Sequence, residues 1–275
     1  MPSVTSITIK KVNAGAITDT NDLLATEEPM EIILDFGTDE KRIRKSISVT
    51  MRTPGNDFEL STGFLYTEGI IHSATDLSAV SYTKKDNENV VMVSLSDNIN
   101  PVIANLERNF YTTSSCGVCG KASIESIRTV CPVPDTFDTL RIPANLVYSL
   151  PGLLRNSQSL FDNTGGLHGC ALFDLEGNLL LSREDVGRHN ALDKLIGAAL
   201  HENLLPLNKH VLMLSGRISF ELVQKAIMSG IKIIAAVGAP SSLAAEMAEE
   251  WGITLIGFLR GEKFNIYSGA ERILL

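Results

Sequence analysis

Strand and helix patterns alternate along the chain from Asp185 to Phe258. A helix between two strands supplies the long crossover that parallel neighbours need. The alternation therefore predicts a parallel sheet covered by helices, which is an α/β fold. The helices are expected at residues 188–200, 220–228 and 243–251, and the strands at 211–214, 231–237 and 253–258.

The preceding part of the chain has a mixed α+β pattern. Asn56 and Glu59 have the spacing of a capping pair, which predicts a helix beginning at Phe58. Short apolar segments separated by polar turns predict strands around this helix. The helix is expected at residues 58–69, and the strands at 31–36, 47–51, 77–83 and 90–95.

Three prolines between residues 131 and 144 indicate a connector between two domains. We predict an N-terminal α+β domain over residues 1–130 and an α/β domain over residues 131–275. A further helix is expected at residues 144–160, and Pro151 should kink it or make it restart, because proline removes a helical hydrogen bond.

Composition and charge exclude several classes of protein. The 275 residues carry a net charge of -8, whereas nucleic-acid-binding surfaces present clustered basic residues, so we expect no nucleic-acid partner. No apolar run has the length of a spanning helix, and the N-terminus lacks the pattern of a signal peptide, so we expect no membrane association. Four cysteines are too few for a disulfide scaffold in a chain of this length, which favours a reducing, cytoplasmic location.

Two cysteines, Cys116 and Cys119, stand in a C-x-x-C pattern just ahead of a segment with helical spacing. Gly117 and Gly120 allow the backbone to turn there without a steric penalty. The thiolate is the reactive form of cysteine, and a helix N-terminus together with the nearby cation Lys121 would stabilise it. The pair is therefore the candidate catalytic site, with a nucleophile that handles sulfur as the favoured interpretation.

Two other interpretations of the cysteine pair stay open. A structural zinc ion usually takes four ligands, and Cys131 and Cys170 do not form a second C-x-x-C pattern. A disulfide-exchange couple needs only the two thiols. No metal site is predicted.

The turns that follow the predicted parallel strands carry glycines, hydroxyls and arginines. Ligands bind outside the carboxyl ends of the strands in an open parallel sheet, so these turns should converge on one crevice. Backbone N–H groups at helix starts and arginine side chains suit a phosphorylated ligand. The turns contain Ser215, Gly216 and Arg217; Gly238 to Ser242; and Arg260, Gly261, Glu262 and Lys263.

A glycine-rich turn around His168 is expected to lead into another strand. His168 is interpreted either as a functional group or as a structural histidine whose hydrogen bonds are satisfied within the turn.

In combination, six segments closely resemble the FdhD family, the formate dehydrogenase accessory sulfurtransferases, over about residues 30 to 270. The resemblance implies a cytidine-deaminase-like, three-layer α/β/α second domain and a homodimer. It also implies that sulfur is taken as a persulfide from a cysteine desulfurase and passed to the molybdenum cofactor of formate dehydrogenase. The six segments are residues 52–55, 64–71, 114–121, 184–194, 215–217 and 255–261.

The resemblance assigns roles to individual residues. Cys116 matches the persulfide cysteine of the family, and Cys119 is its partner in the motif. Phe258, Leu259, Arg260, Gly261, Glu262 and Lys263 match the segment that binds bis-molybdopterin guanine dinucleotide. We therefore expect the crevice to bind a guanine nucleotide as a fragment of the cofactor.

One departure and one absence limit what the resemblance implies. Gly169 and Cys170 follow His168 where small apolar residues are expected, so the resemblance assigns no role to Cys170. The zinc signature of the deaminases, H-x-E with P-C-x-x-C, is absent, so deamination is not expected. The alternative function is a thiol-disulfide oxidoreductase that uses Cys116 and Cys119 as a redox couple.

Overall fold

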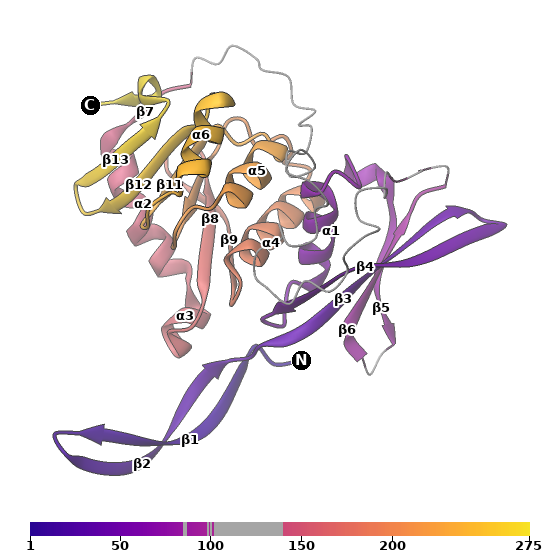
Figure 1. The fold of residues 1–275 in the computed structure, drawn as a ribbon, viewed down its shortest axis with the longest axis horizontal. Coiled ribbons are helices and arrows are strands. Elements are labelled where there is room, and N and C mark those ends of the chain that lie inside the picture. Colours follow the sequence, from indigo (N-terminus) through magenta and orange to yellow (C-terminus); the bar gives the residue numbers. More distant parts are fainter. Residues whose placement is uncertain (85–86, 98, 100, 102–139) are drawn as a thin grey trace.

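The computed structural model describes the chain except for residues 85–86, 98, 100 and 102–139 (Figure 1). The predicted helix after the cysteine pair and the predicted boundary at residues 130 and 131 lie outside the described residues. Elsewhere the chain forms two main sheets with helices packed against them. None of the helices in the described ranges is long and apolar enough to cross a membrane.

The N-terminal part contains a four-stranded sheet in the order β4-β3-β6-β5. Strand β3 pairs in parallel with β6, and the other neighbours are antiparallel. Met30, Ile32 and Leu34 alternate along β3 and are fully buried, because successive side chains of a strand point to opposite faces. The predicted elements are confirmed here as β3 (Glu28–Thr38), β4 (Lys41–Arg52), α1 (Asp57–Thr67), β5 (Leu77–Lys84) and β6 (Asn87–Leu95).

The start of α1 differs from the expected capping box. Asn56 has a left-handed backbone with φ of 57°, and its side chain makes no capping hydrogen bond. Glu59 instead forms an ion pair with Arg183 of β9 (Leu179–Asp185), with Nε and Oε2 2.5 Å apart. A long-range charge partner has therefore replaced the local contact that the spacing predicted.

The second part contains a six-stranded sheet in the order β13-β12-β11-β10-β8-β9. Its three middle strands, β10 (Val211–Leu214), β11 (Ile233–Ala236) and β12 (Thr254–Arg260), are parallel as predicted. The outer strands make the sheet mixed: β8 (His168–Phe173) is antiparallel to β10 and β9, and β13 (Lys263–Ser268) is antiparallel to β12. Short turns join β8 to β9 and β12 to β13, and only antiparallel neighbours can be joined so closely.

Helices cover both faces of this sheet (Figure 1). Phe173, Met213 and Ile233 pack on one face with α2 (Ala144–Ser157), whereas Leu172, Leu212 and Ile234 belong to the core on the other face. That second face carries α4 (Arg188–His201), α5 (Phe220–Met228) and α6 (Ser242–Glu250). The predicted three-layer α/β/α arrangement is confirmed.

The helix at Pro151 does not restart there. Helix α2 continues through Pro151 to Ser157, and α3 (Ser159–Thr164) begins after Gln158. Val147, Leu150 and Leu154 are buried on both sides of the proline. Their packing against the sheet holds the helix in place despite the hydrogen bond that proline removes.

Two close helix contacts join the four-stranded part to the six-stranded part. A Cβ atom on Gly63 of α1 would lie 1.9 Å from the carbonyl oxygen of Asp193 in α4, and one on Gly197 of α4 would lie 1.9 Å from that of Glu59. Only glycine allows the two backbones to approach this closely. Buried apolar residues of the four-stranded part and of the face of the six-stranded sheet that carries α4, α5 and α6 form one cluster.

Two additional pieces of strand structure were not predicted from the sequence. Strands β1 (Val4–Asn13) and β2 (Ala16–Ala25) form a long antiparallel hairpin whose side chains are mostly exposed. Figure 1 shows this hairpin extending away from the two sheets. Strands β7 (Ile142–Pro143) and β14 (Ile273–Leu274) pair in parallel near the C-terminus.

Candidate functional site at the carboxyl edge of the six-stranded sheet

Three predicted turns lie side by side at one edge of the six-stranded sheet. The backbone N–H of Gly238 donates to the carbonyl oxygen of Gly216 over 3.1 Å. The N–H of Phe258 donates in turn to the carbonyl oxygen of Gly238, also over 3.1 Å. The turns after β10 and β11 and the end of β12 are therefore brought together as predicted.

The glycines of these turns are required by close backbone contacts. A Cβ atom on Gly238 would lie 2.7 Å from the carbonyl oxygen of Gly216, and one on Gly257 would lie 3.0 Å from that of Gly238. Such distances leave no room for a side chain without a shift of the backbone. Gly216 and Gly238 are half-buried, so a ligand can approach the edge at these two turns.

The segment 258–263 is a β-hairpin rather than a turn after a strand. Strand β12 continues to Arg260, and β13 begins at Lys263, which leaves Gly261 and Glu262 as the turn. The side chain of Leu259 is buried in the core beneath α2, so only its backbone can meet a ligand. Phe258, Arg260 and Lys263 are exposed.

Positive charges gather around His168, which begins β8 at the same edge. Its Nδ1 atom lies 3.2 Å from the position of a Cβ on Gly216. Burial lowers the pKa of His168, and the charges of Arg188, His189 and Arg217 lower it further. Arg188 and Arg217 therefore act on the same region as His168, and their positive charge suits an anionic ligand.

His189 connects the start of α4 to the start of α5. Its Nε2 atom lies 3.0 Å from Ser219 Oγ and 2.9 Å from Glu221 Oε2, and the residue is buried. Helices α4 and α5 therefore present their N-termini, which carry partial positive charge, to the same edge as Arg188. The sequence predicted that a helix begins at Arg188 and placed both residues in a segment that resembles the family, but nothing local to them predicts this tertiary position.

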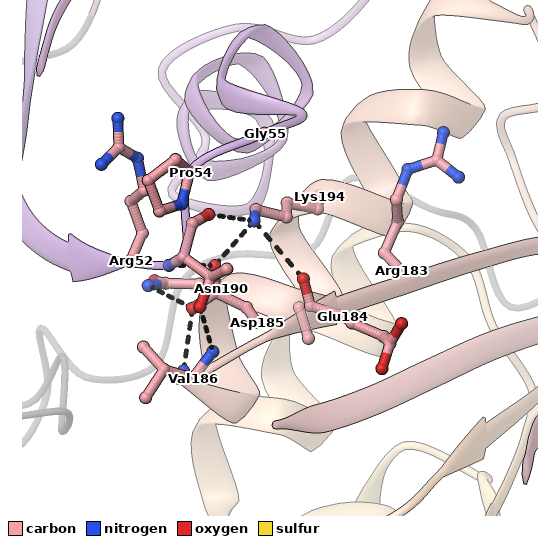
Figure 2. A network of polar contacts seen from close by, with 12 residues as sticks. Arg52, Pro54, Gly55, Arg183, Glu184, Asp185, Val186, Asn190 and Lys194 are labelled. Atoms are coloured by element: carbon pink, nitrogen blue, oxygen red, sulfur yellow. Dashed lines mark hydrogen bonds and ion pairs between the residues drawn. The ribbon is translucent and has the colours of Figure 1, made fainter. Parts of the chain in front are cut away.

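A buried polar network holds this edge against the four-stranded part of the molecule (Figure 2). Lys194 Nζ lies 2.7 Å from Asp185 Oδ2 and donates to the carbonyl oxygen of Thr53 over 2.8 Å. Asp185 also accepts from the backbone N–H groups of Thr53 and Gly187. The network thus fixes the turn that leads from β9 into α4.

A second buried ion pair supports the same contact from the N-terminal side. Arg52 donates through Nε and Nη2 to the two carboxylate oxygens of Asp57, over 3.0 and 2.9 Å. Both side chains are almost fully excluded from solvent. Asp57 also accepts from the backbone N–H of Gly55, so the turn at residues 52–55 is rigidly held.

A pocket of about 560 Å³ adjoins this edge on the side of α2 and α3. Ser215 and His168 contribute to both the edge and the pocket. The other lining residues come from α2, α3, the glycine-rich turn and the end of β11; they are Pro151, Leu154, Arg155, Gln158, Phe161, Gly165, Gly166, Leu167 and Val237.

Cys170 is a structural residue in this arrangement. It is 1% exposed, and its Sγ atom lies 3.0 Å from the carbonyl oxygen of Ala191. Burial raises the pKa of its thiol far above the usual value, which leaves it protonated at neutral pH.

The predicted catalytic residues Cys116 and Cys119 lie outside the described residues, as does Lys121. In the part of the chain that the structure covers, no group of three or more His, Cys, Asp or Glu side chains could hold a metal ion. The zinc interpretation of the cysteine pair stays untested, because both cysteines lie outside the described residues.

These features define the class of the chain as an α/β protein in which arginines lie at the carboxyl edge of the sheet and a buried polar network holds that edge in place. The sequence model of the FdhD/NarQ protein family matches residues 25–274. The chain therefore belongs to that family. The resemblance stated from the sequence motifs is thereby confirmed.

Individual relatives match over nearly their whole length. The chain is 48% identical over 273 residues to the sulfur carrier protein FdhD of Streptomyces coelicolor, covering 96% of this chain and 94% of that one. It is 41% identical over 270 residues to the protein of the same name from Sulfolobus acidocaldarius, covering 98% of each. The crystal structure of a protein described as a formate dehydrogenase accessory protein, from Desulfotalea psychrophila, superposes with a TM-score of 0.76 at 26% identity and covers 99% of this chain and 100% of that one.

Proposed function

We propose that this chain is a cytoplasmic sulfur carrier that passes sulfur to the molybdenum cofactor before the cofactor enters formate dehydrogenase. The relatives named sulfur carrier proteins and the solved formate dehydrogenase accessory protein support this function. In the structure itself, the main support is the edge where the turns after β10 and β11 meet, because Arg217 lies in the first of these turns and Arg188 begins α4 near His168. Such an arrangement suits the phosphates of a nucleotide-bearing cofactor.

The sulfur is carried by Cys116. Its thiolate attacks the outer sulfur of a persulfide on a cysteine desulfurase, and the sulfur–sulfur bond of the donor breaks. The donor leaves as a thiolate, and Cys116 now holds the persulfide, so electrons balance without an external oxidant. Cys119 assists as the second thiol of the motif.

The cofactor, bis-molybdopterin guanine dinucleotide, is the substrate that receives the sulfur. Ser215, Gly216 and Arg217 contact its phosphates from the turn after β10. Phe258, Arg260, Gly261, Glu262 and Lys263, together with the backbone of Leu259, contact it from the β12–β13 hairpin. Arg217 and Arg260 are both exposed and can therefore reach a ligand. The partners are a cysteine desulfurase as donor, formate dehydrogenase as recipient and a second copy of the chain in a homodimer.

Mass spectrometry after incubation with a cysteine desulfurase and cysteine tests the central step. We expect one added sulfur on the wild-type protein and none on Cys116→Ala. An adduct that persisted on Cys116→Ala and disappeared on Cys119→Ala would reverse the two roles. Reduction of insulin without any sulfide donor, and no sulfur adduct, would instead identify a thiol-disulfide oxidoreductase.

A further inference from the structure

The hairpin of β1 and β2, residues 4–25, stands out from the molecule as a two-stranded arm. Every residue from Lys10 to Leu24 is exposed, and Figure 1 shows both strands extending away from the two sheets. A two-stranded hairpin is at best marginally stable in water unless one of its faces packs on another surface. The arm therefore calls for a partner. Residues 4–24 also lie outside the match to the family, which begins at residue 25.

One face of the arm is apolar at both of its ends. Residues that pair directly across the two strands share a face, and the next pair on that face lies two residues further along. On this face Ser6 pairs with Leu23 towards the base, and Val12 pairs with Ile17 at the tip. Val12 is 66% exposed, Ile17 is 64% exposed and Leu23 is 39% exposed. Large apolar side chains are thus left in water at each end of the face.

The middle of the same face is polar and electrically neutral. Thr8 Oγ1 donates to Asn21 Oδ1 over 3.2 Å, and Lys10 Nζ lies 2.9 Å from Asp19 Oδ1. The side chains of Lys10 and Asp19 are 73% and 67% exposed, so a second partner can reach both charges. A surface that fits this face is therefore apolar at both ends and offers both signs of charge in its middle.

A second copy of the arm meets these requirements. Both subunits of a two-fold dimer use the same surface, so that surface must be complementary to itself. With the two-fold axis between the levels of Thr8 and Lys10, Val12 and Ile17 lie against the partner's Leu23, and the polar middle lies against its own copy. The ten residue pairs of the arm place about half of the roughly 20 to 30 residues of a standard interface on one face. Paired arms would thus supply a substantial share of a dimer contact.

We infer that the face of the arm that carries Val12, Ile17 and Leu23 binds the same face of a second copy of this chain. The inference names a contact surface for the homodimer, and it rests on that part of the proposed function.

Sedimentation velocity of the full chain over a range of concentrations tests the inference. Wild type should form a dimer. Ile17→Glu places a charge in the apolar contact twice, once from each copy, so the dissociation constant should rise about a hundredfold. Leu180→Glu is the matched control, because Leu180 is a 42% exposed apolar residue of β9, and the dimer should be unchanged. A monomeric wild type, or a dimer that Ile17→Glu leaves intact, would overturn the inference.

Exchange of the charges in the middle of the face shows whether two arms meet. Lys10→Glu leaves only negative charge there, and Asp19→Lys leaves only positive charge. Each variant alone should dimerise more weakly than wild type, because like charges then face each other. An equimolar mixture of the two variants should dimerise as well as wild type, because opposite charges meet again. A mixture that associates no better than either variant alone would contradict contact between the arms.

Persulfide loading of Cys116 separates this inference from the proposed sulfur transfer. Ile17→Glu should accept sulfur from the cysteine desulfurase like wild type, because the arm faces a second copy and not the donor. Loss of loading with an unchanged dimer would identify the arm as a surface for the donor and would overturn the inference. A wild type that accepts no sulfur, yet forms a dimer that Ile17→Glu dissociates, would overturn the sulfur transfer and leave the inference standing.

Discussion

Lys194 Nζ lies 2.7 Å from Asp185 Oδ2, and both side chains are almost completely buried. The pair joins α4 to the end of β9, and the hydrogen bond from Lys194 to Thr53 ties both to the N-terminal part. Because α4 also begins with Arg188 and His189, this contact positions the carboxyl edge of the six-stranded sheet relative to the rest of the molecule. Removing one partner of an ion pair that is so deeply buried is strongly destabilising, because the other charge is left without compensation.

Lys194→Met should therefore destabilise the protein by about 3 to 5 kcal/mol, because it leaves the carboxylate of Asp185 buried without its cation. Urea unfolding followed by circular dichroism measures the effect. Lys209→Met, at an exposed lysine, is the control and should change the free energy of unfolding little. Equal stability of the two variants would show that the buried pair is not needed to hold the parts together.

Gly63→Ala should cost about 3 kcal/mol or more, because the new Cβ would overlap the carbonyl oxygen of Asp193 and force α1 away from α4. Gly152→Ala is the matched control within a helix: no atom lies within 4 Å of its added Cβ. That change should stabilise the protein by about 0.5 to 1 kcal/mol through helix propensity. Thermal unfolding of both variants measures these changes in stability. Wild-type stability of Gly63→Ala would disprove the close contact between α1 and α4.

The affinity for GDP should depend on the protonation of His168. Its lowered pKa leaves the imidazole neutral at neutral pH in the free protein. A bound anion would oppose the nearby positive charges and raise that pKa, so binding would be coupled to proton uptake. Affinity should therefore increase as the pH falls towards the pKa of the free protein.

GDP itself also titrates, so its binding to wild type, His168→Asn and His72→Asn should be compared by calorimetry. The titrations run from neutral pH down towards the pKa of His168. The variant at His168 should show a smaller pH dependence than wild type, and the variant at the exposed His72 should follow wild type. Identical curves for all three proteins would place the anion away from His168.

Arg260→Ala should weaken the binding of GDP by about one to two powers of ten, since a charge-assisted hydrogen bond contributes roughly 1.5 to 3 kcal/mol. Persulfide loading of Cys116 should be unchanged, whereas activation of formate dehydrogenase should be lost. Unchanged affinity with lowered thermal stability would mean that Arg260 is structural. Loss of loading as well would mean that sulfur acceptance and cofactor binding are not separate functions.

Local sequence patterns predicted most elements of the fold. Helix α5 begins and ends at the predicted residues 220 and 228, because Val223, Ala226 and Ile227 repeat with the period of a helix face. The meeting of the turns at Gly216 and Gly238 also followed from the alternation alone, since parallel strands end at one edge of their sheet. The family was likewise identified from motifs in the sequence and confirmed by the comparisons.

Tertiary packing decided the rest. The capping pair at Asn56 and Glu59 was a sound local pattern, yet Glu59 pairs with Arg183, a residue that no local rule connects to it. Pro151 remains inside α2 because the helix is held by its buried face rather than by its own hydrogen bonds. The contacts of Lys194 with Thr53 and of His189 with Ser219 join segments that are distant in sequence. Periodicity specifies which residues share a face, but burial and long-range charge pairing determine which faces and side chains finally meet.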